Sequence, residues 1–362
     1  MKPVLITLEY PPFYGGIAHY YEHLVRYYPE QIIVVDNQKA ELIDQTRSFF
    51  KWLPAFKTLK QELKQGANYV LVGHLLPLGT VAWFLSLFND FKYTVFLHGD
   101  DLNFALRTSR KKWLALKILN RADKIITANS YTADQTKKII DQKQLGKVRV
   151  VNPGIDPKII RHEEQAIKEL KDKYNLHGKT ILLGIGRLVK RKGYDMAIQA
   201  LKLAIESNAS LIYAIIGQGE EEALIRQQIQ DLGLENNVII LGQVDEQTKS
   251  LWLKTCDIFI MTARNINDDV EGFGIVYLEA NLAGKPVIAG KSGGVADAVE
   301  DNVNGLLVNG ERVEDISQAI LKLSEYESLR QKLGDQGRQR ALQNFNWQKQ
   351  AEKIYDIIHN VK

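Results

Sequence analysis

The stretch at residues 271–279 reads Glu-Gly-Phe-Gly-Ile-Val-Tyr-Leu-Glu, and the prediction of the fold starts from it. The apolar run before it, residues 258–261, is typical of a buried strand, and the stretch itself opens a helix that we expect at about residues 275–283. Gly272 and Gly274 lie at the turn into this helix, where glycine lets the backbone come close to a ligand. Because the first amides of a helix have no internal partner, this turn can hold an anion or a hydroxyl group.

Two glutamates flank this turn. Glu271 comes just before the predicted helix, and Glu279 lies about one turn inside it. We expect both side chains to face one cleft, near the two ends of an extended ligand. The alternative is a capped helix with two solvated glutamates, and the spacing alone favours that alternative. The other motifs of the chain therefore decide between the two interpretations.

Apolar runs and helical patterns alternate along the whole chain, which indicates an α/β protein with parallel sheets covered on both faces by helices. A length of 362 residues suits two domains. The apolar runs begin near Val4, Ile32, Tyr69, Tyr93, Lys124, Val148, Ile181, Leu211, Val238, Ile258, Val287 and Leu306. We predict two Rossmann-like domains, residues 1–156 and 157–345, and an amphipathic helix at about 346–362. Ligands of such sheets bind at the carboxyl ends of the strands, so the expected site is a cleft between two facing domains.

Composition excludes several classes of protein. The chain is 45% hydrophobic and 25% charged, as ordinary globular proteins are, and its net charge is +4. The single cysteine, Cys256, excludes an internal disulfide and a cysteine metal site, and its apolar surroundings predict a core position. We expect no signal peptide before the first strand. The longest apolar stretch, residues 75–88, is short for a membrane span, so we expect a cytoplasmic protein.

Glycines follow several of the predicted strands. Gly15 and Gly16 end the loop after the first strand, where they suit either a phosphate-binding turn or a plain turn. The loop lacks the GxGxxG pattern of dinucleotide-binding domains, which disfavours a nicotinamide cofactor. Glycine turns at residues 217–219 and 292–294, and His98 at the end of the fourth strand, are weak signals when each is considered alone.

A basic loop follows the first strand of the second domain. It reads Gly-Arg-Leu-Val-Lys-Arg-Lys-Gly at residues 186–193 and precedes a helix that begins near Tyr194. A guanidinium and an ammonium group at the end of a strand suit a diphosphate. The alternative for this loop is a solvated basic turn.

Six motifs, in this order along the chain, together resemble the GT-B retaining glycosyltransferases of family 4 over nearly its whole length. They are Gly15-Gly16, His98-Gly99, Asn-Pro-Gly-Ile-Asp at residues 152–156, Arg187 with Lys192, Gly217-x-Gly219, and Glu271-x7-Glu279. The run from Glu271 is most similar to phosphatidylinositol mannoside mannosyltransferases and their bacterial relatives. The resemblance implies a GT-B architecture of two Rossmann-like domains facing across a cleft. The first domain, to which the last helix returns, would bind the acceptor, and the second would bind the nucleotide-sugar donor.

The resemblance also implies roles for individual residues. Arg187 and Lys192 would neutralise the diphosphate of the donor, and His98 and Glu271 would contact its sugar near the reacting carbon. Glu279 would accept hydrogen bonds from the ribose. The other implied donor contacts are Gly15, Gly16, Gly217, Val244, Phe273, Gly274, Ile275 and Val276. Two features depart from the family pattern: the pair Asp100-Asp101 after His98-Gly99, and the loop at residues 263–270, which includes Asp268 and Asp269.

These roles predict a retaining hexosyltransferase, with GDP-mannose as the favoured donor. A departing nucleoside diphosphate requires positive charge. Because the chain contains no Asp-x-Asp sequence, we expect no metal and no other cofactor, with Arg187 and Lys192 supplying the charge. The alternatives are a UDP-glucose- or UDP-GlcNAc-dependent transferase with a soluble acceptor, another GT-B enzyme such as a nucleotide-sugar epimerase or a sugar phosphorylase, and a sugar-nucleotide binder without catalysis.

Two segments of the first domain combine positive charge with apolar side chains. Residues 105–149 hold twelve Lys or Arg against three Asp, a net charge of +9, and residues 46–65 hold five cations against one Glu. The residues assigned to a membrane or acceptor surface are Arg110, Lys111, Lys112 and Trp113. The pattern predicts peripheral binding to an anionic membrane, at its inner face, and a lipid or glycan acceptor. The alternative is that the apolar sides of these segments cover the sheet; no recognition motif indicates nucleic acid.

Overall fold

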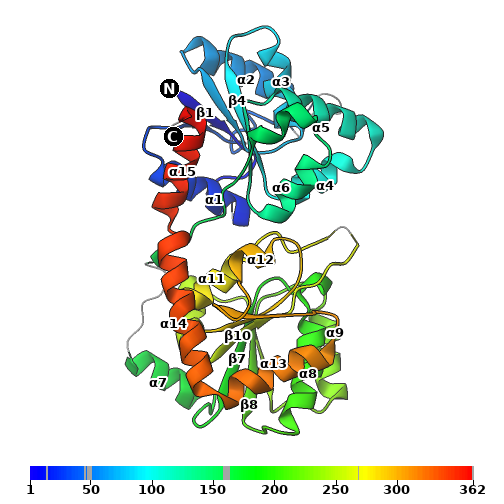
Figure 1. Ribbon diagram of the computed structural model, residues 1–362, viewed down its shortest axis with the longest axis vertical. Helices are drawn as coiled ribbons and strands as arrows, with labels where there is room; N and C mark the ends of the chain where they lie inside the picture. Colours follow the sequence, from blue (N-terminus) through cyan, green and yellow to red (C-terminus); the bar gives the residue numbers. More distant parts are fainter. Residues whose placement is uncertain (14, 45, 47–50, 158–163, 268, 361–362) are drawn as a thin grey trace. The chain divides into compact units, whose positions relative to one another are not determined.

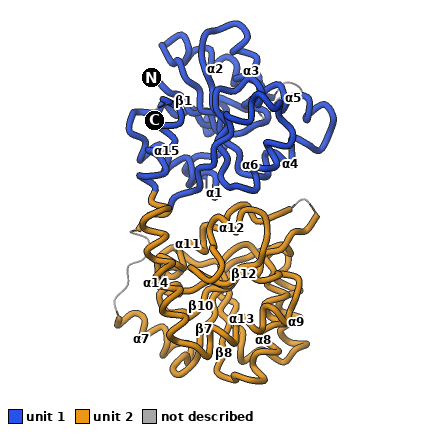
Figure 2. The backbone as a smooth tube through the Cα atoms, in the orientation of Figure 1, with its two compact units in different colours: residues 1–154, 347–362 blue, residues 155–346 orange. Residues whose placement is uncertain are grey.

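The chain forms two compact units (Figure 2). The computed structural model describes residues 1–362 except 14, 45, 47–50, 158–163, 268 and 361–362. Unit 1 consists of Met1–Gly154 and Trp347–Lys362, and unit 2 consists of Ile155–Asn346. The last helix therefore belongs to the same unit as the N-terminus, and Figure 1 shows it beside that end of the chain.

Unit 1 is a parallel sheet in the order β2-β1-β3-β4-β5-β6 with helices on both faces. Its strands are β1 (Pro3–Ile6), β2 (Ile33–Val35), β3 (Tyr69–Val72), β4 (Lys92–Leu97), β5 (Lys124–Thr127) and β6 (Val148–Val150). Its helices are α1 (Gly16–Tyr27), α2 (Leu53–Lys64), α3 (Leu78–Ser86), α4 (Asp100–Leu106), α5 (Ser109–Arg121), α6 (Ser130–Lys137), the 3-10 helix η1 (Gln142–Lys147) and α15 (Trp347–His359). One hydrophobic core joins the sheet to α1 and α15, and another joins it to α2, α3 and α5.

Unit 2 is a second parallel sheet, in the order β12-β11-β10-β7-β8-β9. Its strands are β7 (Thr180–Ile185), β8 (Leu211–Ile216), β9 (Val238–Gly242), β10 (Ile258–Met261), β11 (Val287–Gly290) and β12 (Gly305–Val308). Its helices are α7 (Glu164–Lys173), the 3-10 helix η3 (Lys190–Lys192), α8 (Tyr194–Ile205), α9 (Glu222–Asp231), α10 (Glu246–Thr255), α11 (Ile275–Leu282), α12 (Val295–Ala298), α13 (Val313–Glu325) and α14 (Glu327–Asn344). One core contains residues of α10, α11 and α14, and the other contains residues of α8, α9 and α13.

The predicted α/β class is confirmed, because each predicted apolar run is a strand of one of the two parallel sheets. The inner strands of both sheets are buried on both faces, which is why they read as continuous apolar runs, whereas the edge strands β2, β6 and β9 are only partly buried. Cys256 lies in the core as expected, and burial raises the pKa of its thiol to about 12. Among the described residues, no helix has the length and apolar character needed to cross a membrane.

The return of the chain to unit 1 depends on a close contact between Gly154 and Trp347. Trp347 is buried, with its ring 5.2 Å from that of Tyr20 and stacked 5.3 Å from that of His23. A Cβ atom on Gly154 would lie 2.6 Å from the Trp347 ring. Position 154 therefore has to be glycine for α15 to pack in this way.

We predict that Gly154→Ala destabilises the protein by about 1–3 kcal/mol, because the added methyl group must displace a packed indole ring. Gly146→Ala is the matched control, since a Cβ there would meet nothing within 4 Å. Denaturant unfolding of both variants measures the difference. Equal stability of the two variants would contradict the packing role of position 154.

Candidate active site

The basic loop after β7 rests on a glycine turn after β8. The amide of Leu188 donates to the carbonyl of Gln218 (3.0 Å). A Cβ on Gly217 would lie 1.9 Å from the carbonyl oxygen of Gly186, and Gly217 has a φ of 144°, which favours glycine. A Cβ on Gly219 would lie 2.3 Å from the carbonyl oxygen of Leu188. The turn at 217–219 therefore supports the basic loop through its backbone.

The first two cations of this loop differ in their partners. Lys190 is exposed and lies 3.4 Å from Asp195, which also receives a bidentate pair from Arg264 at 2.9 and 2.8 Å. The Arg187 side chain is exposed and forms no ion pair within the described part of the chain. Arg187 is therefore available to an anionic ligand at the end of β7.

The other two cations of the loop enclose Glu271. Its Oε2 atom lies 2.6 Å from Arg191 Nη1 and 2.6 Å from Lys192 Nζ. Arg191 also contacts Asp269 through Nε at 2.9 Å. Glu271 is only 6% exposed, and burial by itself would raise the pKa of its carboxyl group. Lys192 and Arg191 more than offset that effect, so the pKa of Glu271 lies below its usual value and the group is ionised.

The backbone of Glu271 is held by the glycine turn after β11. Its amide donates to Ser292 Oγ at 3.0 Å, and its carbonyl accepts from the amide of Gly294 at 2.9 Å. Ser292 Oγ in turn donates to Asn265 Oδ1 at 2.8 Å. A Cβ on Gly293 would lie 2.2 Å from the carbonyl oxygen of Glu271, and its φ of 48° is left-handed. This turn fixes where the Glu271 side chain starts.

Helix α11 begins just after Glu271, as predicted. Gly274 precedes it with a φ of 78°, and no side chain caps the helix. A Cβ on Gly274 would lie 2.4 Å from the Tyr277 ring, whose hydroxyl donates to the carbonyl of Met261 at 2.8 Å. Ile275 and Val276 are half-buried, and their amides belong to the helix turn that lacks internal acceptors. Phe273, by contrast, is buried in the core, 5.8 Å from the Phe345 ring.

Glu279 lies one turn further along α11, buried beside a lysine of α10. Its Oε1 atom lies 3.1 Å from Lys249 Nζ, which also lies 2.7 Å from Glu246. Its Oε2 atom is buried and has no hydrogen-bond partner among the described residues. Buried polar atoms are normally satisfied, so an unpaired carboxylate oxygen marks a position where a ligand hydroxyl could donate.

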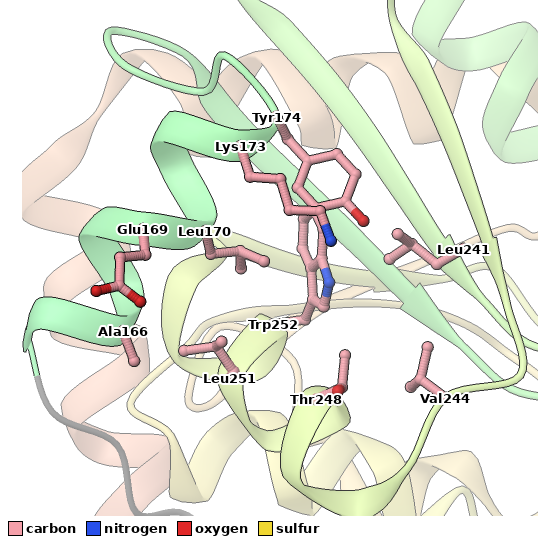
Figure 3. Close-up of a pocket in the computed structure, with 10 residues that line it drawn as sticks. All are labelled: Ala166, Glu169, Leu170, Lys173, Tyr174, Leu241, Val244, Thr248, Leu251 and Trp252. Atoms are coloured by element: carbon pink, nitrogen blue, oxygen red, sulfur yellow. The ribbon is translucent and has the colours of Figure 1, made fainter.

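Val244 lines a pocket of about 340 Å³ between α7, α10 and β9 (Figure 3). The side chains of Tyr174 and Trp252 face each other there, with ring centroids 5.2 Å apart. Leu170 of α7 and Leu241 of β9 also point into the pocket. The structure thus places the side chain of Val244 at this pocket, while its proposed backbone contact to a base stays a prediction.

His98 lies at the end of β4 in unit 1, enclosed by two tyrosines. Its Nε2 atom is 2.9 Å from the Tyr21 hydroxyl, and its ring meets that of Tyr20 edge to face at 4.8 Å. The Tyr21 hydroxyl donates its proton to the carbonyl of Gly73 (2.8 Å), so His98 donates through Nε2 and leaves Nδ1 unprotonated. Burial, with a smaller contribution from His74, lowers the pKa of His98 to about 3. His98 is therefore a neutral imidazole at pH 7.

The family departure after His98 has a local structural explanation. Asp101 Oδ2 accepts a hydrogen bond from the His98 amide at 2.9 Å, and burial raises the pKa of this carboxyl group. Asp101 therefore fixes the backbone that carries His98. In the same unit Gly15 is the N-cap residue of α1 and Gly16 is its first residue, and among the described residues no side chain caps that helix. A Cβ on Gly16 would meet no described atom within 4 Å.

The residues assigned to a membrane surface lie on or beside an exposed side of α5. Arg110, Lys112 and Trp113 are exposed, whereas Ala115, Ile118 and Leu119 on the same helix are buried in the core. The alternative, that the apolar side chains cover the sheet, is therefore correct for those three residues and wrong for Trp113. In the second basic segment, residues 47–50, which include Phe49 and Phe50, lie outside the described residues, as does Asp268 in unit 2.

Among the described residues, one group of three side chains that could bind a metal ion lies close together, on α1. His19, Glu22 and His23 have ligand atoms within 4.8 Å of one another. Glu22 also contacts Arg26 at 3.2 Å, and His23 Nδ1 lies 2.8 Å from the His19 carbonyl oxygen. This group contains none of the predicted site residues, and the absence of a metal in the reaction stays a prediction.

Two functional candidates were missed by sequence reasoning. Arg191 stands in the basic loop beside Lys192, and only the fold shows that it contacts Glu271 while Arg187 does not. Lys249 lies on α10, and its contact with Glu279 spans 30 positions of sequence. The helical period could have placed Lys249 on a helix, but no local signal in the sequence indicates which carboxylate it faces.

We predict that wild-type stability falls as the pH drops from 7 to 5, relative to that of His98→Gln. The unfolded chain protonates His98 near pH 6.5, whereas the folded protein does so only near pH 3, so acid favours unfolding. Between pH 7 and pH 5 the wild type should lose about 2 kcal/mol of unfolding free energy relative to His98→Gln. Urea unfolding at both pH values measures it, and a difference that does not change with pH would contradict a neutral, enclosed His98.

Comparison with known proteins agrees with these features. Residues 166–340 match the family model described as "Glycosyl transferases group 1". A GDP-mannose-dependent alpha-(1-6)-phosphatidylinositol monomannoside mannosyltransferase of Mycolicibacterium smegmatis is 26% identical over 98% of this chain and 97% of its own length. A GDP-mannose-dependent monoacylated alpha-(1-6)-phosphatidylinositol monomannoside mannosyltransferase of Corynebacterium glutamicum is 27% identical over 99% and 98%.

The fold also matches solved structures. The crystal structure of Anabaena HepE in complex with UDP covers all of this chain and all of that one, with a TM-score of 0.82 and 20% identity. Glycosyltransferase WaaG covers 98% of this chain and 99% of its own, with a TM-score of 0.70 and 19% identity. The chain thus has the GT-B fold of these structures, and its residues 166–340 match the glycosyl transferases group 1 model.

Proposed function

We propose that the protein transfers mannose from GDP-mannose to a lipid acceptor, with retention of configuration at the reacting carbon. The observation that carries this proposal is that the cations of the basic loop at residues 186–193 differ in their ion pairs. Arg191 holds Glu271, whereas Arg187 has no ion pair within the described residues and Lys192 contacts Glu271 with one of its three donors. The loop therefore keeps positive charge available while it fixes a carboxylate. The named mannosyltransferase relatives support the choice of donor and acceptor.

In this proposal Arg187 and Lys192 stabilise the departing diphosphate. The bond between the sugar carbon and the phosphate oxygen breaks, and its electron pair goes to the phosphate. An acceptor hydroxyl then attacks the same face of the sugar and gives its proton to the departing phosphate oxygen. Charge develops on that oxygen, so fixed cations beside it lower the barrier more than they favour binding. The amide of Gly16 would add to this effect.

The two glutamates would bind opposite ends of the donor. Glu271 is ionised, and its carboxylate can accept hydrogen bonds from sugar hydroxyls near the reacting carbon. Glu279 has a buried oxygen that no described residue contacts by a hydrogen bond, and the ribose hydroxyls can donate to it. The uncapped amides of Ile275 and Val276 lie between these two glutamates in the sequence and can donate to the phosphate or the sugar. His98 is neutral, so it would contact the sugar by hydrogen bonding and not as an acid.

A donor screen tests the proposal. The protein is incubated with GDP-mannose, UDP-glucose and UDP-GlcNAc, with and without a membrane lipid extract, and release of the nucleoside diphosphate is measured. We expect GDP release from GDP-mannose that rises in the presence of lipid. Turnover of a UDP-sugar alone would overturn the choice of donor, and an epimerised nucleotide sugar without release would overturn the transferase reaction for this chain.

We predict that Arg187→Ala and Lys192→Ala each lower kcat by about 10²–10³, because each removes a charge that contacts the departing phosphate. Lys190→Ala is the matched control: it removes a cation from the same loop that already pairs with Asp195. Its turnover should stay near that of the wild type. Activity should also persist in EDTA; complete loss that magnesium or manganese restores would contradict the metal-independent reaction.

We predict that Glu279→Gln mainly raises KM for the donor, whereas Glu271→Gln mainly lowers kcat. Ribose is bound alike before and during the reaction, while the charge on the sugar changes, so the two losses appear in different constants. Steady-state kinetics separates them, with thermal unfolding as a control because Glu271→Gln leaves Arg191 and Lys192 without their carboxylate. Identical kinetic changes in two folded variants would contradict this division of roles.

A further inference from the structure

Unit 1 contains a second pocket that no step of the proposed transfer uses. It encloses about 410 Å³ beside α3, α4 and α5. Its apolar lining is Trp52, Leu76, Pro77, Phe104 and Leu114. This volume lies within the range of about 300–1,000 Å³ that is typical of small-molecule sites with mainly apolar walls. An apolar group of ligand size can therefore be buried there.

Two cations also line this pocket. Arg110 is exposed and forms no ion pair with any described residue. Lys111 is half-buried, and its Nζ atom lies 3.5 Å from the centroid of the Phe104 ring. Within the described part of the chain no carboxylate neutralises either cation, so an anionic group could bind them without displacing a pair seen there. The pocket thus combines an apolar interior with positive charge.

An exposed aromatic surface lies next to the pocket. Trp52 lies 5.5 Å from Phe56, which lies 5.5 Å from Phe84, and Phe84 lies 5.4 Å from Phe88. In this run Phe84 is 45% and Phe88 72% exposed, whereas Trp52 and Phe56 are half-buried; Trp113 on α5, separately, is 55% exposed. Contiguous exposed apolar side chains mark a contact surface, and aromatic side chains beside cations suit the boundary between water and lipid.

We propose that this pocket binds one hydrocarbon chain of an anionic lipid while Arg110 and Lys111 bind its phosphate. This ligand class follows from the apolar walls together with the two cations. A soluble sugar phosphate would make no contact with the apolar walls, and an uncharged apolar ligand would make no ion pair with Arg110 or Lys111. The inference deepens the proposed function, since it rests on a lipid acceptor and assigns the site that would draw that lipid out of the membrane. Thr80 also lines the pocket, so a larger side chain at this position would reduce the space available to the hydrocarbon chain.

Binding of monomeric alkyl phosphates tests this inference without a membrane and without a donor. Butyl, hexyl, octyl and decyl phosphate are titrated below their micelle concentrations by calorimetry. Each methylene that enters the pocket should tighten binding about fourfold, until the pocket is full and the affinity levels off. Inorganic phosphate should bind at least about a hundredfold more weakly than decyl phosphate. An affinity that does not depend on chain length would overturn the inference.

Variants locate the binding in this pocket. Thr80→Phe should fill it and weaken decyl phosphate binding at least tenfold without changing the binding of inorganic phosphate. Arg110→Ala should weaken both about tenfold, whereas Lys117→Ala removes an exposed cation of α5 that does not line the pocket and should change neither. If Thr80→Phe does not fold, Phe104→Ser opens the apolar wall and should also weaken decyl phosphate binding. Unchanged chain binding in every folded pocket variant would overturn the inference.

The test of this pocket can fail or succeed independently of the test of the proposed transfer. GDP release from GDP-mannose, measured on the same preparations, tests the transfer and does not require this pocket to be filled. Tight binding of alkyl phosphates without any transfer would support the pocket and contradict the proposed function. Transfer together with binding to anionic vesicles, but without chain-dependent binding of monomers, would leave the transferase standing and overturn the pocket.

Discussion

The candidate site depends on one buried carboxylate held between two cations. Glu271 is almost fully enclosed, and its ionised state is maintained by Arg191 and Lys192 at hydrogen-bond distance. A charged group in such a place is costly unless it is paired, and loss of one partner typically costs about 3–5 kcal/mol. Three charges kept together in this way contribute little net stability. We interpret the arrangement as one retained for chemistry, since it fixes a negative group against the loop that also carries Arg187, a cation without an ion pair among the described residues.

The backbone around Glu271, Arg191 and Lys192 is held in position by turns that follow parallel strands. Glycines after β8 and β11 are packed against carbonyl groups of the loops that carry the cations and Glu271. Any side chain at Gly217 or Gly293 would push those loops apart. The Glu271 backbone is held by hydrogen bonds at both its amide and its carbonyl. The site is therefore built mostly from main-chain contacts, which position charged side chains with little freedom and prepare them before a ligand arrives.

Much of this structure is predictable from the sequence, because both sheets are buried on two faces and their strands read as unbroken apolar runs. The turn before α11 is predictable too, since a left-handed position such as Gly274 favours glycine. Pairing among charges is not predictable in the same way. Arg187 and Arg191 are chemically identical in the sequence, and only the path of the backbone decides which one contacts Glu271 and which one stays exposed. Lys249 on α10 contacts Glu279 on α11, and a pattern along the sequence does not indicate a contact between these two helices.

The central claim is that the loop after β7 is the phosphate site and that Glu271 faces the transferred sugar. A crystal structure of the protein with GDP-mannose bound tests it most directly. The account predicts that the diphosphate contacts Arg187 and Lys192, that the ribose hydroxyls reach the free oxygen of Glu279, and that Glu271 accepts from the sugar. A diphosphate bound away from the loop, or held by a metal ion with Arg187 still exposed to solvent, would contradict the account.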